Sequence, residues 1–413
     1  MRYYKQNKRT YYFSFCVFII ISFLYFSCAQ KESNENINND YTVAAYVWPS
    51  CHDEPMARAY WSEGIGEWEM IKKGKPVFEG HYQPRIPLWG YKMDDDPLAW
   101  EQKIDAATEH GVNAFIFDWY WYDGKPFLEK TVSEGFLKAR NNNQMKFYFM
   151  WANHNSQGQD MNAWRYKTDT TLWSGEVDWD NFKTIVDRLI NQYFKRPNYL
   201  KINGEPYFSI YQIDNLVKSF NGLNGTKEAL DYFREEVKKA GFPGLHLQIV
   251  GRGTHEPILF NRYKEYSEGK SVNEIISKLG INSITTYNWF ASGTNDDYIK
   301  CAENAMSMQS KWDSTLTVPY FPNVSMGRDD TPRRPYIKKE GLIHYNNSPE
   351  SFGAYLQKAR DFLRNHPKQP KLIIIYAWNE WVEGSYLEPD MKWGYGYLEA
   401  VKKVMSGEYD KYQ

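Results

Sequence analysis

The chain has 413 residues, a formal net charge of −1 and a mean hydropathy of −0.69, and 17% of its residues are aromatic. This length allows one large barrel domain or two ordinary domains. The balanced charge excludes the electrostatic attraction on which nucleic-acid binding depends, so we expect no nucleic-acid partner. The many Tyr and Trp rings can stack on the apolar faces of sugars, or they can fill a large core.

The N-terminus has the features of an export signal. Basic residues at 2–9 precede an apolar run at 11–26, which is shorter than the roughly 20 residues of a membrane span. Ser27 and Cys28 follow, and residues 31–40 are rich in Asn, Glu and Ser. This order resembles a bacterial lipoprotein signal with Cys28 as the lipidation site. The alternatives are an ordinary cleaved signal and an uncleaved anchor.

These features predict three segments: a lipoprotein signal peptide at 1–27, a flexible tether at 28–40 and a folded domain at 41–413. The protein would then be exported and held by its lipid in the membrane, at the outer membrane or the periplasmic face. With an ordinary cleaved signal it would be secreted or periplasmic instead. We expect the folded domain to be a monomer.

The cysteines of the folded domain are Cys51 and Cys301, because Cys16 falls in the signal and Cys28 is the predicted lipid site. Cys51 and Cys301 could form one disulfide in an oxidising compartment, or they could be two buried thiols. No Cys/His cluster has the spacing of a metal site, so we expect no metal and no cofactor.

Short apolar and aromatic runs alternate with helical patterns after Tyr41. The eight runs are residues 42–48, 114–118, 146–151, 206–211, 245–250, 283–287, 316–321 and 372–378. Several are apolar on both faces, as buried strands of a parallel sheet are. Helical spacing and capping residues predict helices at 97–110, 180–193, 226–240, 302–312, 348–362 and 395–404. The alternation predicts an α/β fold, a single (β/α)8 barrel with long loops after its strands, and a doubly wound open sheet is the alternative.

Barrel enzymes carry their chemistry at the carboxyl ends of the strands, and the residues there are of one kind. They are aromatic, amide, imidazole, carboxylate or guanidinium side chains: Trp48, Asp118, Trp119, Tyr120, Trp121, Trp151, Asn153, His154, Tyr211, Arg252, Tyr287, Asn288, Trp289, Asn323, Asn379, Glu380, Trp381 and Glu383. Together they predict a pocket with stacking platforms, hydrogen-bond donors for hydroxyl groups and a few acids, which suits an oligosaccharide or polysaccharide.

Two carboxylates, Glu380 and Glu383, emerge three residues apart from the eighth run, between Trp378 and Gly384. Glycoside cleavage needs a proton donor for the leaving oxygen and a second carboxylate near the anomeric carbon. The pKa values of the two groups must differ, and an apolar wall raises one of them. Trp378 and Trp381 could form that wall. On its own, however, a Glu-x-x-Glu pair is common and also fits a solvated loop.

Several ordered motifs make the resemblance specific. Residues 379–384, followed by Glu388 and Pro389, look like the signature of glycoside hydrolase family 99 and its WbsX-like relatives. Earlier segments at 61–68, 75–84, 117–125 and 151–153 are similar to the WbsX-like group, so the resemblance covers roughly 41–404.

That resemblance implies a (β/α)8 catalytic domain and metal-free cleavage of α-mannoside-type linkages with retention. It assigns Glu380 as the base that deprotonates the substrate 2-hydroxyl, which attacks the anomeric carbon and forms a 1,2-anhydro sugar. Glu383 is then the general acid and, in the second step, the general base. The resemblance also makes His81 and Tyr82 sugar contacts.

Other residues leave alternatives open. Asp118 either acts on Glu380 or a sugar hydroxyl, or it caps the following turn. Arg252 either binds a charged substituent, such as a sulfate or a carboxylate, or forms a salt bridge with Glu256. Residues 46–52 and 153–155 depart from the relatives' usual motifs at predicted pocket ends, which leaves the identity of the sugar open.

Two other classes of function compete with a hydrolase. The WbsX-like group is named for glycosyltransferases of polysaccharide assembly, but 251–253 lacks the rest of a nucleotide-binding glycine motif, and Asp96 before Pro97 fits a helix cap. Export would also separate the protein from nucleotide-sugar donors. A non-catalytic glycan-binding lipoprotein would keep the aromatic platforms without needing both acids.

Overall fold

The computed structural model describes residues 40–409 except 253–258, 261–262, 290–296 and 335–342. The predicted signal peptide, residues 28–39 of the tether and Cys28 lie outside the described residues. Within the described residues, no helix has the length and apolar character needed to cross a membrane.

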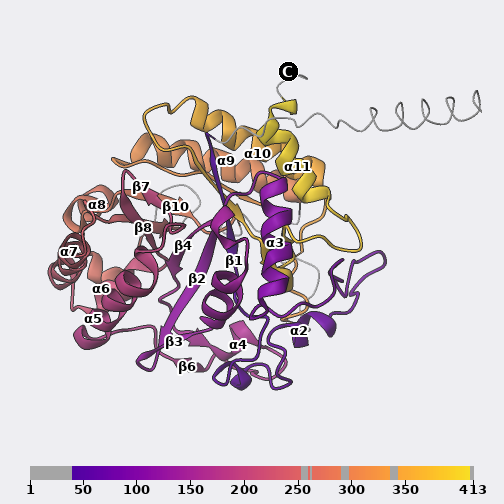
Figure 1. Ribbon diagram of the computed structural model, residues 1–413, viewed down its shortest axis with the longest axis horizontal. Helices are drawn as coiled ribbons and strands as arrows, with labels where there is room; N and C mark the ends of the chain where they lie inside the picture. The colour runs from indigo at the N-terminus through magenta and orange to yellow at the C-terminus, as the bar shows by residue number, and fades with distance from the viewer. Residues whose placement is uncertain (1–39, 253–258, 261–262, 290–296, 335–342, 410–413) are drawn as a thin grey trace, which may run out of the picture. The chain divides into compact units, whose positions relative to one another are not determined.

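Eight parallel strands form a nearly closed barrel, as the alternation predicts (Figure 1). Their order around the barrel is β10, β9, β8, β4, β2, β1, β12 and β11. Their bounds are β1 Thr42–Val47, β2 Ala114–Tyr122, β4 Lys146–Trp151, β8 Glu205–Ile210, β9 His246–Gly251, β10 Ser283–Thr286, β11 Asn323–Ser325 and β12 Leu372–Tyr376. In the register, Val43 of β1 lies opposite Ile373 of β12, and Tyr46 lies opposite Ile116 of β2.

The barrel closes between β10 and the chain just before β11. Ile284 donates its N–H to the Pro319 carbonyl at 3.0 Å, and its own carbonyl accepts from Phe321 at 2.9 Å. The seventh strand thus begins later than the run at 316–321 predicts, because α9 (Tyr298–Thr315) extends to that point and Leu316 caps it. Pro322 interrupts the strand since it has no N–H to donate.

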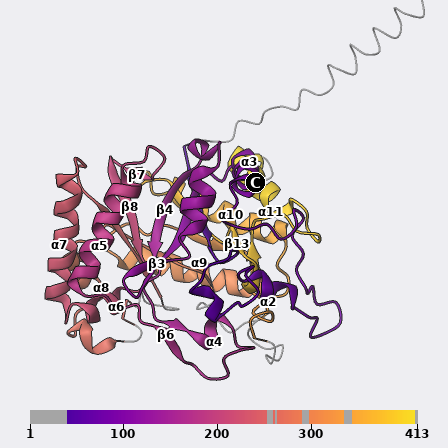
Figure 2. The same cartoon turned by 60° about the horizontal axis from the view of Figure 1, so that its bottom comes forward.

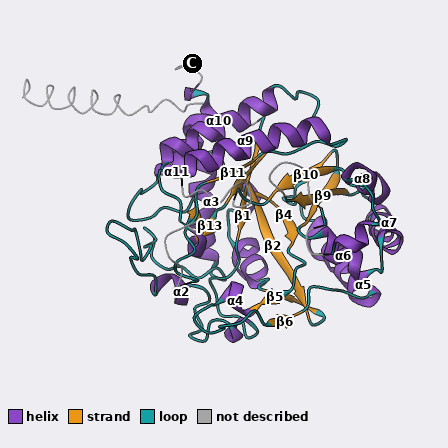
Figure 3. Ribbon diagram, turned by 180° about the vertical axis from the view of Figure 1, so that it is seen from behind, coloured by secondary structure: helices purple, strands orange, loops and turns teal. Residues whose placement is uncertain are grey.

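Helices surround the barrel (Figure 3). Those that pack around it are α3 Pro97–Glu109, α5 Trp179–Arg188, α6 Ile213–Ser219, α7 Leu223–Lys239, α8 Val272–Leu279, α9, α10 Pro349–Arg364 and α11 Gly396–Ser406. The α3 helix begins as predicted, with the Asp96 carboxylate accepting from the Leu98 N–H at 2.9 Å. One connection departs from the alternation: between β2 and β4, fully described here, the chain forms the hairpin strand β3 (Lys125–Phe127) and short helical turns at 131–138 in place of an α-helix.

Aromatic side chains fill the layer between the barrel and α3. Trp100 of α3 packs edge-on against Phe115 at 5.5 Å between ring centroids and contacts Phe117 and Phe136 at 5.4 and 5.6 Å. All nine residues of β2 are buried. The two-sided apolar pattern of this strand is therefore explained by burial against the barrel interior on one face and helices on the other.

The carboxyl ends of the strands are covered by long loops that carry small elements. These are α2 (Trp68–Lys72), α4 (Gly158–Met161) and the paired short strands β5 (Ser156–Gln157) and β6 (Thr171–Trp173). Figures 1 and 2 place α2, α4, β3 and β6 together at this end of the barrel. A candidate site at the strand ends is thus roofed by the first loop and by the loop after β4.

A buried ion-pair network ties α3 to the chain after β12. The Lys103 ammonium lies 2.6 Å from an Asp94 oxygen and 2.8 Å from a Glu388 oxygen, and the Lys103 side chain is 2% exposed. Glu388 also accepts from the indole N–H of Trp381 at 2.7 Å. This network fixes the segment that carries the two predicted catalytic carboxylates.

We expect Lys103→Met to lower the free energy of unfolding by about 3–5 kcal/mol, because it leaves two buried carboxylates without their cation. Urea unfolding at pH 7 measures the loss. The control is Lys238→Met, whose ammonium pairs with Glu235 at the surface and is half exposed. An equal, small effect of both substitutions would contradict the role given to the buried network.

Candidate active site

A short hairpin at the end of β12 presents Glu380 and Glu383 to one cavity. Strand β13 (Asn379–Glu380) pairs antiparallel with β14 (Ser385–Tyr386), and a helical turn at Trp381–Glu383 joins them. The turn ends at Gly384 with φ +70°, where a Cβ atom would lie 2.9 Å from the Asp329 side chain. Glycine is therefore required here for both conformation and space.

Asn379 fastens this hairpin to the end of β1. Its amide oxygen accepts from the Trp48 N–H at 2.8 Å, and its amide nitrogen donates to the Trp48 carbonyl at 2.9 Å. Asn379 is buried, so both bonds are shielded from water. Asn379, which the sequence predicts as a sugar contact, thus holds the hairpin that carries Glu380 against the end of β1.

The cavity has a volume of about 380 Å³ and lies at the carboxyl ends of the strands. It combines aromatic rings, four arginines and four acids. Its lining is Trp48, Asp118, Tyr120, Met150, Ala152, His154, Asp160, Met161, Tyr211, Arg252, Tyr287, Arg328, Arg333, Arg334, Glu380 and Glu383.

Glu383 is held by a hydroxyl and a guanidinium. The Tyr376 hydroxyl donates to one carboxylate oxygen, and Arg333 Nη1 donates to the other at 2.8 Å. The second terminal nitrogen of Arg333 lies 3.1 Å from Glu67, which in turn accepts from the Trp48 indole N–H at 2.5 Å. Both carboxylate oxygens of Glu383 therefore accept a hydrogen bond, and the bond from Arg333 is charge-assisted.

Glu380 has a different environment. It is buried, its Oε1 lies 3.4 Å from the Tyr287 hydroxyl, and its Oε2 has no hydrogen-bond partner within the described part of the chain. Burial, and then the charge of Glu383, raise the pKa of Glu380 well above its usual range. The two carboxylates therefore differ in their hydrogen bonding: both oxygens of Glu383 have a partner, whereas Oε2 of Glu380 has none in the described part of the chain.

Asp118 shares the Tyr287 hydroxyl with Glu380. Tyr287 donates to Asp118 Oδ2 at 2.6 Å, the shorter of its two contacts. Burial raises the pKa of Asp118 well above its usual range. The ring of Tyr287 lies edge-on against Tyr46 and Tyr376, each at 4.7 Å between centroids, which supports the carboxylates from below.

Strand alternation separates the predicted contacts into two sets. Asp118 and Tyr120 of β2 face the cavity, whereas Trp119 between them points outward and donates to Glu129 at 2.9 Å. Likewise Trp151 points outward, against Phe182, while its neighbours in the chain line the cavity. The predicted residues that line the cavity are Trp48, Asp118, Tyr120, His154, Tyr211, Arg252, Tyr287, Glu380 and Glu383.

The other predicted contacts are structural or lie elsewhere. The Asn153 amide exchanges hydrogen bonds with the backbone of Gln212, both at 2.8 Å. Trp381 is fully buried and stacks on Tyr386 at 3.8 Å between centroids. Asn288 is outside the cavity lining.

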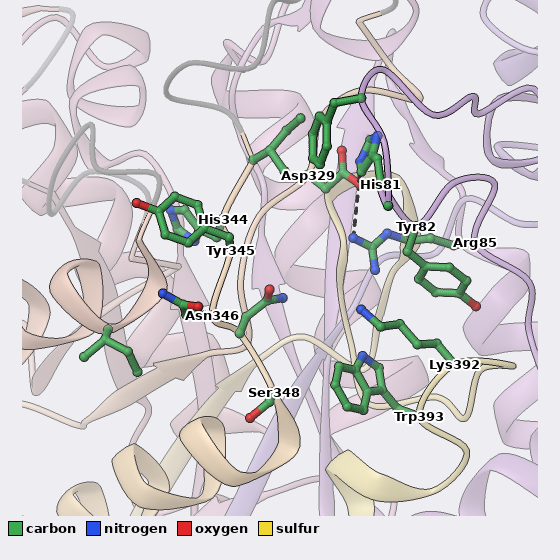
Figure 4. A pocket seen from close by; sticks show the side chains of 15 residues that line it. His81, Tyr82, Arg85, Asp329, His344, Tyr345, Asn346, Ser348, Lys392 and Trp393 are labelled. Atoms are coloured by element: carbon green, nitrogen blue, oxygen red, sulfur yellow. Dashed lines mark hydrogen bonds and ion pairs between the residues drawn. The ribbon is translucent and has the colours of Figure 1, made fainter.

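His81 and Tyr82 line a second cavity of about 680 Å³ (Figure 4). His81 Nε2 and Arg85 Nη2 lie 3.0 and 3.1 Å from the same oxygen of the buried Asp329. The Asp329 N–H donates to the Glu383 carbonyl at 2.7 Å. These residues therefore contact the hairpin through Asp329, and they line the second cavity and not the one that contains the carboxylate pair.

Several site residues carry no strand-end signal in the sequence. Arg328, Arg333 and Arg334 belong to the long connection between β11 and α10, and Glu67 belongs to the first loop. The cluster of arginines in one insertion is a signal that could have found the first three. Arg252 is in the cavity, while its alternative partner Glu256 lies outside the described residues.

Cys51 and Cys301 are buried and are not joined by a disulfide, which decides between the two alternatives. In the ranges that the structure describes, no group of three His, Cys, Asp or Glu side chains could hold a metal ion.

Comparison with known proteins identifies relatives of the whole folded domain. A family model described as glycosyltransferase WbsX matches residues 43–401. An uncharacterized protein WxcX from Xanthomonas campestris pv. campestris strain B100 is 27% identical over 379 residues, which cover 88% of this chain and 50% of that protein. The chain therefore spans about half the length of the curated relatives that it matches.

Solved structures show the same fold. A glycoside hydrolase-like protein has a TM-score of 0.55 at 16% identity, with 90% of this chain and 95% of that chain covered. A GH99 endo-alpha-mannosidase from Bacteroides thetaiotaomicron has a TM-score of 0.54 at 14% identity, with 90% and 98% covered. These similarities support a TIM-barrel-like fold.

We expect Glu380→Gln to stabilise the protein at pH 8 more than at pH 4.5. Since the pKa of Glu380 is raised on folding, its contribution to stability is present in acid and is lost as pH rises through the folded-state pKa. A neutral amide avoids that loss. Thermal unfolding between pH 4.5 and 8 measures the difference in Tm, with the exposed Glu235→Gln as control. A difference in Tm that does not grow with pH would contradict the buried, protonated state of Glu380.

Proposed function

The chain belongs to the glycosyltransferase WbsX family, and from this premise we propose that it is a glycoside hydrolase that cleaves α-linked, mannoside-type glycans with retention. We further propose that it is exported and anchored in the membrane by a lipid on Cys28. The observation that carries the proposal is the pair of carboxylates, Glu380 and Glu383, on one turn in one cavity.

Two glutamates on so short a turn favour contact with neighbouring atoms of one sugar. In the proposed first step, Glu380 takes the proton of the 2-hydroxyl, and O2 forms a bond to the anomeric carbon. The bond to the leaving oxygen breaks as Glu383 donates a proton to it, which gives a 1,2-anhydro sugar. In the second step, Glu383 takes a proton from water and the water oxygen attacks the anomeric carbon. The bond between that carbon and O2 breaks, and Glu380 returns its proton to O2.

The first step requires ionised Glu380, whereas burial raises the pKa of Glu380 and favours its protonated form. A substrate 2-hydroxyl that donates to Glu380 would stabilise the ionised form. Substrate binding would thus prepare Glu380 to act as the base. The competing assignment, with Glu380 as the acid, needs no such change.

Variants and two kinds of substrate distinguish these assignments. Glu383→Gln should lower kcat/KM on an unactivated α-mannoside by roughly 10²–10⁴, the usual contribution of general acid–base catalysis. On an α-mannosyl fluoride, whose leaving group needs no acid, Glu383→Gln should recover most of the formation of the anhydro sugar, whereas Glu380→Gln should stay inactive. If Glu380→Gln, and not Glu383→Gln, recovered activity on the fluoride, Glu380 would be the acid and Glu383 the base. A Glu383→Gln variant as active as wild type would remove Glu383 from the mechanism.

NMR of the first-formed product tests the stereochemistry. We expect retention at the anomeric carbon, because two displacements at that carbon restore its configuration. A panel of α-linked glycans supplies the substrate. Inversion of configuration would exclude the anhydro-sugar route while leaving hydrolysis in place.

The family description favours a second candidate, a glycosyltransferase. Transfer of labelled sugar from a nucleotide-sugar donor to a glycan by the purified protein would support it. Sugar binding that is unchanged in Glu380→Gln and Glu383→Gln, with no cleavage by the wild type, would indicate a non-catalytic binding protein.

A further inference from the structure

Arg252 is the cation of the cavity that lacks an acidic partner in the described ranges. It follows directly after β9, at the carboxyl end of the strand, and its guanidinium lies over the Tyr211 ring at 4.6 Å from the centroid. Arg252 is partly exposed and lines the cavity together with Tyr211. Stacking on a ring fixes the plane of the guanidinium and leaves its N–H groups available to a ligand.

The other three arginines of the cavity are matched by carboxylates. The pairs are Arg328 with Asp330 at 2.8 Å, Arg333 with Glu383 at 2.8 Å and Arg334 with Asp160 at 3.0 Å. The remaining acids of the lining, Asp118 and Glu380, have pKa values raised by burial, so they do not supply a compensating negative charge. In the described ranges, Arg252 is thus the arginine of the cavity that has no carboxylate in ion-pair contact.

We propose that the cavity binds a glycan bearing an oxyanion, either a uronate carboxylate or a sulfate ester, and that Arg252 recognises this group. The proposal rests on the proposed function to the extent that the ligand is a glycan. A planar guanidinium donates two parallel hydrogen bonds to such oxyanions, and a neutral hydroxyl cannot accept in this geometry.

The ring contacts place the oxyanion relative to the carboxylate pair. The Tyr211 ring lies 5.2 Å from the Tyr287 ring, whose hydroxyl reaches Asp118 and Glu380. The Tyr211 ring thus contacts both Arg252 and Tyr287, and Tyr287 is the one of these residues whose hydroxyl reaches Glu380. The charged group then belongs to the sugar next to the one held by Glu380 and Glu383, or to the far edge of that same sugar.

His154 and Tyr211 are the rings of the cavity lining near the proposed position of the charged group. Their rings lie 5.5 Å apart between centroids, and both line the cavity. His154 stands in one of the motifs in which this sequence departs from its relatives. A substrate that differs from a neutral mannoside at this position agrees with that departure.

The test uses pairs of probes that differ in the oxyanion alone. Oligosaccharides from uronate-containing bacterial polysaccharides are compared with their carboxyl-reduced forms, and sulfated α-mannan fragments with desulfated ones. Binding is measured by calorimetry in the Glu383→Gln background, so that no probe is consumed. Arg252→Ala and Arg252→Lys are compared there with Arg140→Ala, a matched loss of an exposed arginine that pairs with Glu101 at the surface.

We expect one acidic member of a pair to bind at least about tenfold more tightly than its neutral form, the scale of one charged hydrogen-bonded contact. Arg252→Ala should remove this preference, so that the acidic and neutral forms bind equally. Arg252→Lys should recover it in part, because a point charge cannot donate bidentately, and Arg140→Ala should retain it. The pair that shows the effect identifies carboxylate or sulfate.

Equal binding of acidic and neutral members, or an equal loss of both in Arg252→Ala, would overturn the proposal. Failure of every acidic probe to bind would overturn it as well. Acidic binding through Arg252 without cleavage by the wild type would instead overturn the proposed hydrolase and leave this inference standing. Cleavage of neutral glycans in preference to acidic ones would overturn this inference and leave the proposed hydrolase standing.

Discussion

A single guanidinium holds the acidic site together. Arg333 lies between Glu383 and Glu67 and contacts both, and Glu67 is completely buried. Without this cation, two carboxylates would face each other in a medium of low dielectric constant, which is strongly unfavourable. Because Glu67 also receives the Trp48 indole N–H, Arg333 connects the first loop, the end of β1 and the hairpin after β12. The geometry of Glu383 thus depends on a residue that belongs to none of the strands.

The period of two along a strand decides which side chains enter the cavity. Asp118 and Tyr120 face inward, and Trp119 faces the surrounding layer, although all three follow one another at the same strand end. The sequence predicted the eight-stranded barrel, most strand bounds within a residue or two, and the position of the carboxylate pair in one cavity. From the sequence alone, every polar or aromatic residue at a strand end is predicted to be a contact. The face on which each residue lies depends on the register of the barrel, and composition does not specify that register.

What the sequence could not predict lies in the long loops. Arg328, Arg333 and Arg334 reach the cavity from the connection before α10, whose path is set by tertiary contacts such as the bond of the Asp329 N–H to Glu383. His81 was expected beside the sugar because its motif resembles that of the relatives, yet it supports the hairpin through Asp329. Similarly, Asn379 was predicted to contact the sugar, and its amide exchanges hydrogen bonds with the backbone of Trp48. A motif preserves such residues equally well whether they bind a sugar or position the residues that do.

The protonation of Glu380 and the charge of Arg252 are linked through one electrostatic argument. An anionic ligand that entered a neutral cavity would raise the pKa of Glu380 further and oppose its ionisation. A guanidinium that pairs with the incoming oxyanion removes this effect, since the ligand and Arg252 together add no net charge near Glu380. Arg252 would therefore allow an acidic glycan to bind without keeping the proton on the residue that has to take one from the 2-hydroxyl. The same cavity can then combine a buried base with a charged substrate. The condition is that the cation can contact the ligand without contacting Glu380. Arg252 meets it because it lies on the ring of Tyr211, which contacts the ring of Tyr287.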